Sequence, residues 1–399
     1  MANYAFADLV GDEQVFFAEY FNKKPMLRKN AVPGDPRDIL SHRKLDQLVN
    51  LEVVRPPYIK VNLGGNGVPE QGYTRNVVVQ GQTITDVVDP EKIYELFRAG
   101  ATVTWCSLNQ IVPELRDFTR VISESMAVRT DSVAFLTPTG KKGYPPHHDP
   151  VDLFIVQLEG TKHWKLWNPP AERLGDNAQY TLEGLGEPEI EVSLQPGDVL
   201  YLPYGTPHAA AAEGKASLHL SVMMRPRMWK DLLRQTVEEL ITADESGEFN
   251  AYPYIGELRS PEVETGFAEK IAALAARLQG VAAGAELDRL ADLGRHMEGS
   301  SAGNTFQAIA DMDELGPDVR LKRGSAPLEF GVSDNGRTQM TVNGHKIAVP
   351  TPIAETLAAL GPDASIAASL IFPGADAVRS TKAAQGLTRL GVFELAAAG

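Results

Sequence analysis

Two kinds of hydrophobic spacing divide this chain into segments. Several windows before residue 130 carry apolar residues three to four positions apart, the spacing of one face of a helix. Between residues 132 and 224, short β-rich runs follow one another, separated by glycine and proline, as in strands joined by turns. After Pro226 the helical spacing returns. The pattern therefore predicts a β-rich segment flanked by helices.

The expected elements of the first 224 residues follow from these windows. The number and even spacing of the β runs favour an antiparallel β-sandwich or barrel. Helices are predicted at 12–21, 39–54, 90–99 and 113–126, and strands at 26–28, 101–106, 132–137, 149–158, 162–167, 190–194, 198–203 and 216–224.

The remainder of the chain is predicted to hold two further parts. Helical patterns at 228–242, 261–278 and 285–296 predict an all-α region, and residues 298–304 a linker. Beyond this linker, short helices with a β-ribbon suggest a small winged-helix-like α+β module. We therefore expect domains at 1–224, 225–300 and 301–399. Within the last one, strands are predicted at 328–332, 339–342, 346–349 and 391–395, and helices at 351–360 and 377–389.

Composition narrows the class of protein. The 399 residues are enough for two or three domains. A formal charge of −14 argues against a general nucleic-acid binder and would suit a basic partner, although it could serve solubility alone. Cys106 is the only cysteine, so no internal disulfide can form. With neither a signal-peptide pattern nor about 18 uninterrupted apolar residues, we expect a cytoplasmic protein without a membrane segment.

The residues with the clearest chemical meaning are His147, Asp149 and His208. Side chains at positions i and i+2 of a strand share a face, so His147 and Asp149 can point into a barrel while His148 points away. His208 arrives from a distant strand through the turn Pro203-x-Gly205-x-x-His208, in which Gly205 permits backbone conformations closed to other residues.

Two imidazoles and one carboxylate on one side of an ion leave three coordination positions open. This set is typical of non-haem Fe(II) centres that bind a co-substrate and O2. Zn²⁺ accepts the same ligands. The three residues could also be unrelated surface and core side chains, but their placement within one β-rich segment favours a shared site.

These residues resemble the JmjC branch of the cupin superfamily. His147-x-Asp149 corresponds to the first cupin motif as it stands in 2-oxoglutarate oxygenases, and Gly197-x5-Pro203-x-Gly205-x-x-His208 to the second. The chain is most similar to the ribosomal oxygenase group of protein hydroxylases over about residues 10–224. The motifs behind this are Leu136-Thr137-Pro138, Gly143-Tyr144-Pro145-Pro146-His147-His148-Asp149, the run from Gln157 to Trp167, the run from Leu194 to His208, and Ser217-Leu218-His219-Leu220-Ser221.

The resemblance implies a fold and a chemistry. It implies a double-stranded β-helix (cupin jelly roll) with flanking helices, then a helical dimerisation region and a winged-helix module. Fe(II) would be held by His147, Asp149 and His208, with 2-oxoglutarate and O2 as co-substrates. Lys162, at the family's position for a cation, would bind the distal carboxylate of 2-oxoglutarate; without the resemblance it could be an ordinary exposed lysine. Ser221 and Tyr144 are weaker candidates for co-substrate contacts, and His219 for a hydrogen-bonded core residue.

Three departures from the group leave the substrate open. Val133 stands where the group often has an asparagine, Ala209–Ala212 follow the distal histidine, and Pro150 follows Asp149. The expected activity is hydroxylation of a side chain in a protein or peptide, such as a ribosomal protein. The alternatives are an oxygenase of a small natural product or free amino acid, an N-methyl-lysine demethylase, and a non-enzymatic cupin/winged-helix regulator.

Two expectations concern partners. The near balance of basic and acidic residues after residue 320 argues against DNA binding by the C-terminal module. The apolar helices at 228–296 favour a homodimer, the alternative being that they pack on their own chain.

Overall fold

The computed structural model describes residues 4–140, 144–173, 175, 178–243, 246–295, 310, 315–324, 328–342, 345–361 and 364–395. Two compact units divide the chain, Met1–Arg295 and His296–Gly399. A boundary near residue 300 was expected, and the further boundary at 224 stays a prediction. The linker expected at 298–304 lies outside the described residues.

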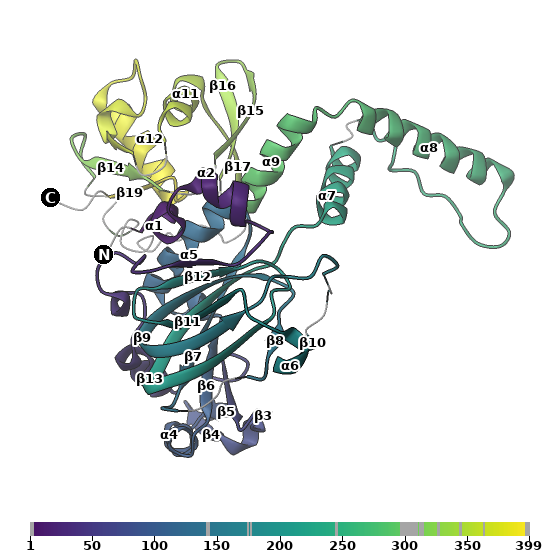
Figure 1. Ribbon diagram of the computed structural model, residues 1–399. Helices are drawn as coiled ribbons and strands as arrows, with labels where there is room; N and C mark the ends of the chain where they lie inside the picture. The colour runs from purple at the N-terminus through teal and green to yellow at the C-terminus, as the bar shows by residue number, and fades with distance from the viewer. Residues whose placement is uncertain are drawn as a thin grey trace. The chain divides into compact units, whose positions relative to one another are not determined.

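An antiparallel sheet of eleven strands forms the body of the first unit (Figure 1). Its main path runs β1-β12-β9-β13-β7-β6-β2-β3, with β11 paired to β9 and β8 paired to both β10 and β13. The antiparallel β core expected from the turn spacing is confirmed. Its strands are β1 (Met26–Arg28), β2 (Ile59–Leu63), β3 (Asn66–Gly67), β6 (Thr102–Cys106), β7 (Thr130–Thr137), β8 (His147–His148), β9 (Asp152–Leu166), β10 (Ala178–Gln179), β11 (Ile190–Leu194), β12 (Val199–Leu202) and β13 (His208–Met224).

Two long strands, β9 and β13, organise this sheet. They pair with each other along almost their whole length, with the register shifting between Glu213 and Leu218. The sequence pattern predicted two strands at 149–158 and 162–167 where the structure has β9, and a start at residue 216 for the strand that is β13. The structure corrects both, because β9 passes through Gly160 without ending and Ala209–Ala212 are ladder residues of β13.

Helices and a separate hairpin complete the first unit. The helix expected at 39–54 is shorter, since α3 ends at Val49 and the following residues form a turn. The β4–β5 hairpin and β2 were not predicted. The elements are α1 (Phe6–Val10), α2 (Glu13–Val15), the π-helix η1 (Phe16–Tyr20), the 3-10 helices η2 (Pro36–Asp38), η3 (Glu70–Gly72) and η4 (Leu108–Gln110), α3 (His42–Val49), β4 (Thr74–Val79), β5 (Gln82–Val88), α4 (Pro90–Arg98), α5 (Pro113–Met126), α6 (Leu182–Leu185), α7 (Trp229–Thr242), α8 (Pro261–Gln279) and α9 (Ala283–Arg295).

Two apolar clusters lie against the sheet. The larger one joins α1, α3, α4 and α5 to one face, with Phe16, Trp105 and Phe118 fully buried. A smaller one lies among β9, β11 and β12 and includes Trp164 and Leu166. Because Lys162 alternates in step with these two residues, the β9 pattern turns its side chain inward too, as the sequence predicted.

The second unit has its own apolar core, centred on Leu321, Met340 and Phe393. It contains two small antiparallel sheets, β18-β14-β19 and β15-β16-β17, with helices α11 and α12. The name winged helix stays a prediction. The bounds are β14 (Arg320–Arg323), β15 (Leu328–Asp334), β16 (Arg337–Val342), β17 (His345–Pro350), α11 (Thr351–Ala359), β18 (Ser365–Ala367), the 3-10 helix η6 (Ala368–Leu370), α12 (Ala377–Arg389) and β19 (Phe393–Leu395).

None of the helices in the described part of the chain is long and apolar enough to cross a membrane.

Candidate metal centre

The pairing of β8 with β13 brings the two candidate histidines together. His147 and His208 are directly opposed residues of this pair. Asp149 follows β8, and its carbonyl accepts a hydrogen bond from the Gly205 amide at 3.1 Å. Gly205 has a φ of +77°, which side-chain-bearing residues rarely adopt. The turn before His208 is thereby joined to the segment that carries Asp149.

Three side chains converge on one point at this junction. Asp149 Oδ2 lies 3.8 Å from His147 Nε2 and 3.9 Å from His208 Nε2. The ring centroids of the two histidines are 4.3 Å apart, and one ligand atom from each residue lies within 4.8 Å of the others. Two ligand atoms that each bind the same metal ion at about 2.1 Å can lie up to about 4.2 Å apart. The carboxylate is therefore within reach of one ion together with either imidazole.

Backbone carbonyls set the tautomers of both rings. His147 Nδ1 lies 2.7 Å from Pro145 O, and His208 Nδ1 lies 2.9 Å from Thr206 O. A carbonyl only accepts, so each Nδ1 carries a hydrogen and each Nε2 keeps its lone pair for a metal. Burial lowers the pKa of His208 to about 4, with a smaller contribution from His147, so this ring is neutral at pH 7.

The three side chains of the triad differ in their exposure to solvent. The His208 side chain is 7% exposed, whereas those of His147 and Asp149 are 24% and 28% exposed. The protein thus closes the site behind His208 and leaves it accessible on the β8 side. A mononuclear centre with free coordination positions fits this arrangement.

A cavity next to the triad contains every other candidate from the sequence. Lys162, Ser221 and Tyr144 line it together with His147, Asp149 and His208. Ser221 is buried, and Tyr144 is partly exposed and meets the rings of Phe135 and His147 edge-on. Val133, the departure from the family pattern, pairs with Ser221 across β7 and β13 and does not line the cavity.

Lys162 is a buried cation in this cavity. Its ammonium lies 3.4 Å from Thr137 Oγ1 and 3.3 Å from His219 Nδ1. Burial lowers the pKa of Lys162 to about 7. Within the described ranges, no carboxylate lies at ion-pair distance from it. A buried charge without a counter-ion is costly, so the cavity favours an anionic ligand.

His219 has a larger part in the site than the sequence indicated. Its ring stacks on Phe135 with centroids 4.9 Å apart and meets Trp164 edge-on. Burial, with Lys162 nearby, lowers the pKa of His219 well below its usual value. Since an ammonium can only donate, the neutral ring accepts from Lys162 at Nδ1. The two-residue spacing from Ser221 was a usable signal that both face the cavity.

His148 lies outside the cavity, as the alternation along β8 predicted. It is fully buried, and its Nδ1 is 2.6 Å from the hydroxyl of Tyr180. It does not line the cavity and does not belong to the cluster of potential ligands.

A polar network holds the turn that precedes His208. The buried Asp152 carboxylate accepts from Tyr201 Oη at 2.6 Å and from the Tyr204 amide at 3.3 Å. Arg173 donates to Tyr204 O at 2.7 Å and to Asn22 Oδ1 and O at 2.9 and 2.8 Å. Burial raises the pKa of Asp152. These bonds tie the turn to the N-terminal segment of the same unit.

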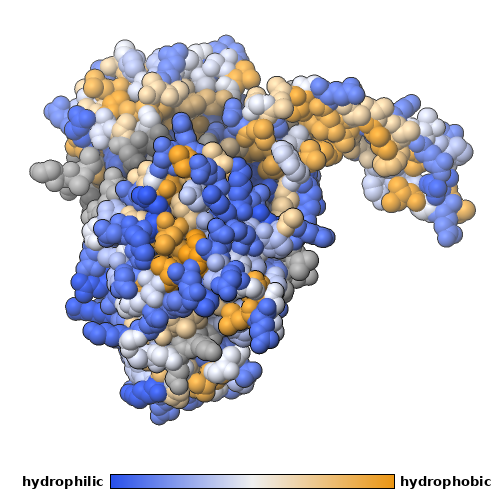
Figure 2. All heavy atoms as spheres, viewed as in Figure 1, coloured by the Kyte–Doolittle hydropathy of each residue, from blue (hydrophilic) through white to orange (hydrophobic). Residues whose placement is uncertain are grey.

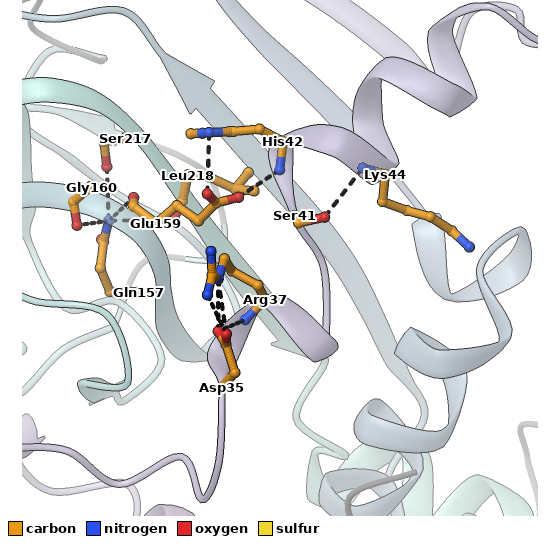
Figure 3. Close-up of polar contacts among 10 residues, drawn as sticks. All are labelled: Asp35, Arg37, Ser41, His42, Lys44, Gln157, Glu159, Gly160, Ser217 and Leu218. Atoms are coloured by element: carbon orange, nitrogen blue, oxygen red, sulfur yellow. Dashed lines mark hydrogen bonds and ion pairs between the residues drawn. The ribbon is translucent and has the colours of Figure 1, made fainter.

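A second polar network, centred on Gln157, lies at the bend of β9 (Figure 3). Gln157 Nε2 donates to Ser217 Oγ and Glu159 O, both at 2.9 Å, with longer contacts to Gly160 O and Leu218 O. Gly160 has a φ of +67°, and a Cβ there would lie 2.1 Å from Ala216 O. This tight bend comes just before Lys162 and fixes where its side chain enters the cavity.

Comparison with known proteins agrees with this geometry. Residues 109–232 match the family model for the JmjC domain. This part of the chain is similar to JmjC domains. The matched segment contains β7, β8, β9 and β13, and so all the triad residues.

The relatives are named as a demethylase and hydroxylase or as oxygenases. The bifunctional lysine-specific demethylase and histidyl-hydroxylase NO66 of Aedes aegypti is 30% identical over 232 residues, covering 55% of this chain and 34% of that protein. Ribosomal oxygenase 1 of Homo sapiens is 32% identical over 211 residues, covering 47% and 32%. The chain thus spans about a third of the length of these relatives.

One solved structure extends the likeness in fold to nearly the whole chain. The ribosomal oxygenase YcfD from Escherichia coli, in complex with cobalt and 2-oxoglutarate, matches with a TM-score of 0.54 and 18% identity. The match covers 97% of this chain and 98% of that one.

Proposed function

We propose that this protein is an Fe(II)- and 2-oxoglutarate-dependent oxygenase that hydroxylates a side chain of a protein or peptide. One observation carries the proposal: a triad of His147, Asp149 and His208 shares a cavity with Lys162, a buried cation that has no carboxylate at ion-pair distance among the described residues. A dicarboxylate that ligates a metal at one end needs a cation at the other.

Each residue has a distinct part in this proposal. His147, Asp149 and His208 would hold Fe(II), which supplies O2 activation coupled to decarboxylation of 2-oxoglutarate when both are bound. Lys162 would bind the distal carboxylate, with His219 and Thr137 orienting its ammonium. Ser221 would contact the co-substrate from the floor of the cavity. Tyr144, at the exposed side, would contact co-substrate or substrate and limit the entry of water.

The proposed substrate class comes from the relatives and the charge. The names of the relatives include histidyl-hydroxylase and ribosomal oxygenase. A chain of formal charge −14 would attract a basic protein or peptide, such as a ribosomal protein. The same charge disfavours nucleic acid as a partner, because it opposes phosphate binding. We place the protein in the cytoplasm.

We further propose a homodimer formed through the all-α region expected at residues 225–300, followed by a winged-helix-like module at 301–399. Helix α8 has 19 residues and none of them is buried. Figure 2 displays apolar side chains along this helix, where Phe267 is 67% and Ile271 is 55% exposed. Phe267→Glu should convert a dimer to a monomer in sedimentation, whereas Val78→Glu, at a similarly exposed apolar residue on β4, should not.

The oxygenase proposal is tested in two steps. Fe(II) and 2-oxoglutarate binding is measured without oxygen, and succinate release is then measured in air with basic peptides, including ribosomal-protein sequences. Wild type and His163→Ala should bind metal and turn over, whereas His147→Ala should do neither. Gain of one oxygen atom by the peptide, seen by mass spectrometry, would establish hydroxylation. Binding with turnover only on free amino acids would contradict the peptide substrate, and no metal binding would contradict the enzyme.

A further inference from the structure

The strand β8, which carries His147, is paired with its neighbours over a short length. It consists of His147 and His148, and the register of its pairing with β13 contains one pair, His147 with His208. On its other edge β8 pairs with β10, His147 opposite Gln179 and His148 opposite Ala178 (Figure 1). So short a strand depends on side-chain contacts as well as on backbone bonds for its orientation.

The ring of His148 makes such a contact. It is fully buried, and its Nδ1 shares a hydrogen bond of 2.6 Å with the hydroxyl of Tyr180. The centroids of the two rings are 5.6 Å apart. Tyr180 directly follows β10 and is partly buried. Neither ring lines the cavity beside the triad (the metal-centre cavity), so the bond joins β8 to the segment after β10 on the outer face of β8.

This bond also constrains His147. Successive residues of a strand point to opposite faces, so a rotation of β8 that moved the His147 ring would move the His148 ring as well. That movement would break a hydrogen bond of a buried group, which is unfavourable. The contact of His148 with Tyr180 thus keeps His147 Nε2 directed at the point where it converges with Asp149 and His208.

The position of Tyr180 is fixed without its hydroxyl. Its backbone amide donates to Pro146 O at 2.8 Å. The next residue, Thr181, is the N-cap of α6, and its side chain accepts a hydrogen bond from a backbone amide of that helix. Just after α6, the carbonyl of Gly186 accepts from Trp167 Nε1 at 3.0 Å. Removal of the hydroxyl alone should therefore leave the backbone of this segment in place.

We propose that Tyr180 is a positioning residue for the metal centre: through its bond to His148 it holds β8 in the orientation in which His147 binds the ion. The inference rests on the proposed function, because it needs a metal at the triad. The apparent affinity for a ligand falls with the fraction of the free protein that is in the binding arrangement. A looser β8 should therefore weaken metal binding although no ligand atom has changed.

The first test is metal binding by the full-length protein, measured by calorimetry and by absorption spectroscopy during titration with Co²⁺. Tyr180→Phe should weaken binding about three- to tenfold, the effect of losing one hydrogen bond. Tyr58→Phe is the matched control, since the Tyr58 hydroxyl also bonds to one side chain, that of Gln110, at 3.2 Å, in a segment without a triad residue. The control should bind metal as the wild type does, even where both variants lose similar stability to urea.

A second set of variants tests whether the effect passes through His148. His148→Asn keeps a hydrogen-bonding atom near the place of Nδ1 and should bind metal nearly as the wild type does, whereas His148→Leu should bind as weakly as Tyr180→Phe. Addition of Tyr180→Phe should cause the full loss in His148→Asn and no further loss in His148→Leu, because there the bond is already absent. Equal further losses in both backgrounds would overturn the role of His148. The comparison with Tyr58→Phe does not depend on whether His148→Leu folds.

A measurement without metal separates this inference from the proposed function. Hydrogen exchange at the amides of residues 147–149 in the metal-free protein should be faster in Tyr180→Phe than in the wild type or Tyr58→Phe. Absence of metal binding by the wild type would contradict the proposed function and this role with it. Metal binding by the wild type with equal affinity in Tyr180→Phe, or unchanged exchange at these amides, would overturn the positioning role alone.

Discussion

Lys162 and His219 form a hydrogen-bonded pair inside the metal-centre cavity, with 3.3 Å between Nζ and Nδ1. They come from β9 and β13, which pair with each other beside the bend at Gly160. The ammonium donates to His219 and to Thr137, so one of its three hydrogens remains for a ligand. The pair therefore presents a positive group with one free donor to whatever anion enters the cavity.

Removing this cation should separate co-substrate binding from metal binding. Lys162→Met keeps most of the volume of the side chain and loses the charge. We expect the affinity for 2-oxoglutarate to fall by about 10- to 100-fold, since a charge-assisted hydrogen bond contributes roughly 1.5–3 kcal/mol. Metal binding, followed by absorption spectroscopy with Co²⁺, should be unchanged.

Lys165→Met is the matched control for this substitution. Lys165 is on the same strand but on its outer face, where its Nζ pairs with Glu191 Oε1 at 2.9 Å. The variant should bind 2-oxoglutarate as the wild type does. An equal loss in both variants would show that the effect is structural.

The affinity for 2-oxoglutarate should also depend on pH. Burial lowers the pKa of Lys162 from 10.5 to about 7, so the free protein loses this positive charge as the pH rises through 7. An anion bound beside the amine favours the protonated form and raises its pKa. Affinity should therefore be highest below pH 7 and fall by up to about tenfold per unit above it. Calorimetry above pH 7 should detect proton uptake on binding, which Lys162→Met abolishes; uptake that persists in that variant would assign the proton elsewhere.

Strand alternation predicted the placement of His147 and Asp149, whereas His208 was predicted from the turn Pro203-x-Gly205-x-x-His208 and the family resemblance. His147 and Asp149 share a face as an i, i+2 pair, His148 faces away, and Lys162 turns inward with Trp164. Such relations need only a strand and its period. The antiparallel core was likewise visible in the regular turns between residues 132 and 224.

What the pattern missed depends on partners distant in sequence. Gly160 reads as a turn, so β9 was split in two, but β13 pairs with both halves and keeps the strand continuous. The pairing register of β9 and β13 also determines whether His219 is a core residue or lines the cavity. The β4–β5 hairpin did leave a local signal, Gln80-Gly81 between alternating residues, both with positive φ. The helix expected to continue to residue 54 ends at Val49, and Val54 is buried from the segment that follows the helix.

The network around Arg173 should control metal affinity through the His208 turn. Arg173→Gln removes the bonds to Tyr204 O and Asn22 and frees the turn that His208 follows. We expect metal affinity to fall by about tenfold, the lower range for outer ligand supports. Arg116→Gln is the control, since it also removes bonds to two backbone carbonyls, of Asn109 and Gln110, in an element without a triad residue. Equal metal affinities in the two variants would contradict a role for the turn.

The bend at Gly160 should be among the least tolerant positions of the β core. A methyl group there meets Ala216 O at 2.1 Å in addition to the strain of a φ of +67°. Gly140 has the same φ but open space around the position of a Cβ, so it isolates the backbone strain. Gly140→Ala should lower the free energy of unfolding by about 1–2 kcal/mol. Gly160→Ala should lower the free energy of unfolding by roughly 3 kcal/mol or more, because the β9–β13 ladder must shift as well.

Because Lys162 follows this bend, any folded Gly160→Ala protein should also bind 2-oxoglutarate more weakly than Gly140→Ala. Urea unfolding and calorimetry of the pair measure both effects, and similar losses of stability would show that the β9–β13 contact can relax.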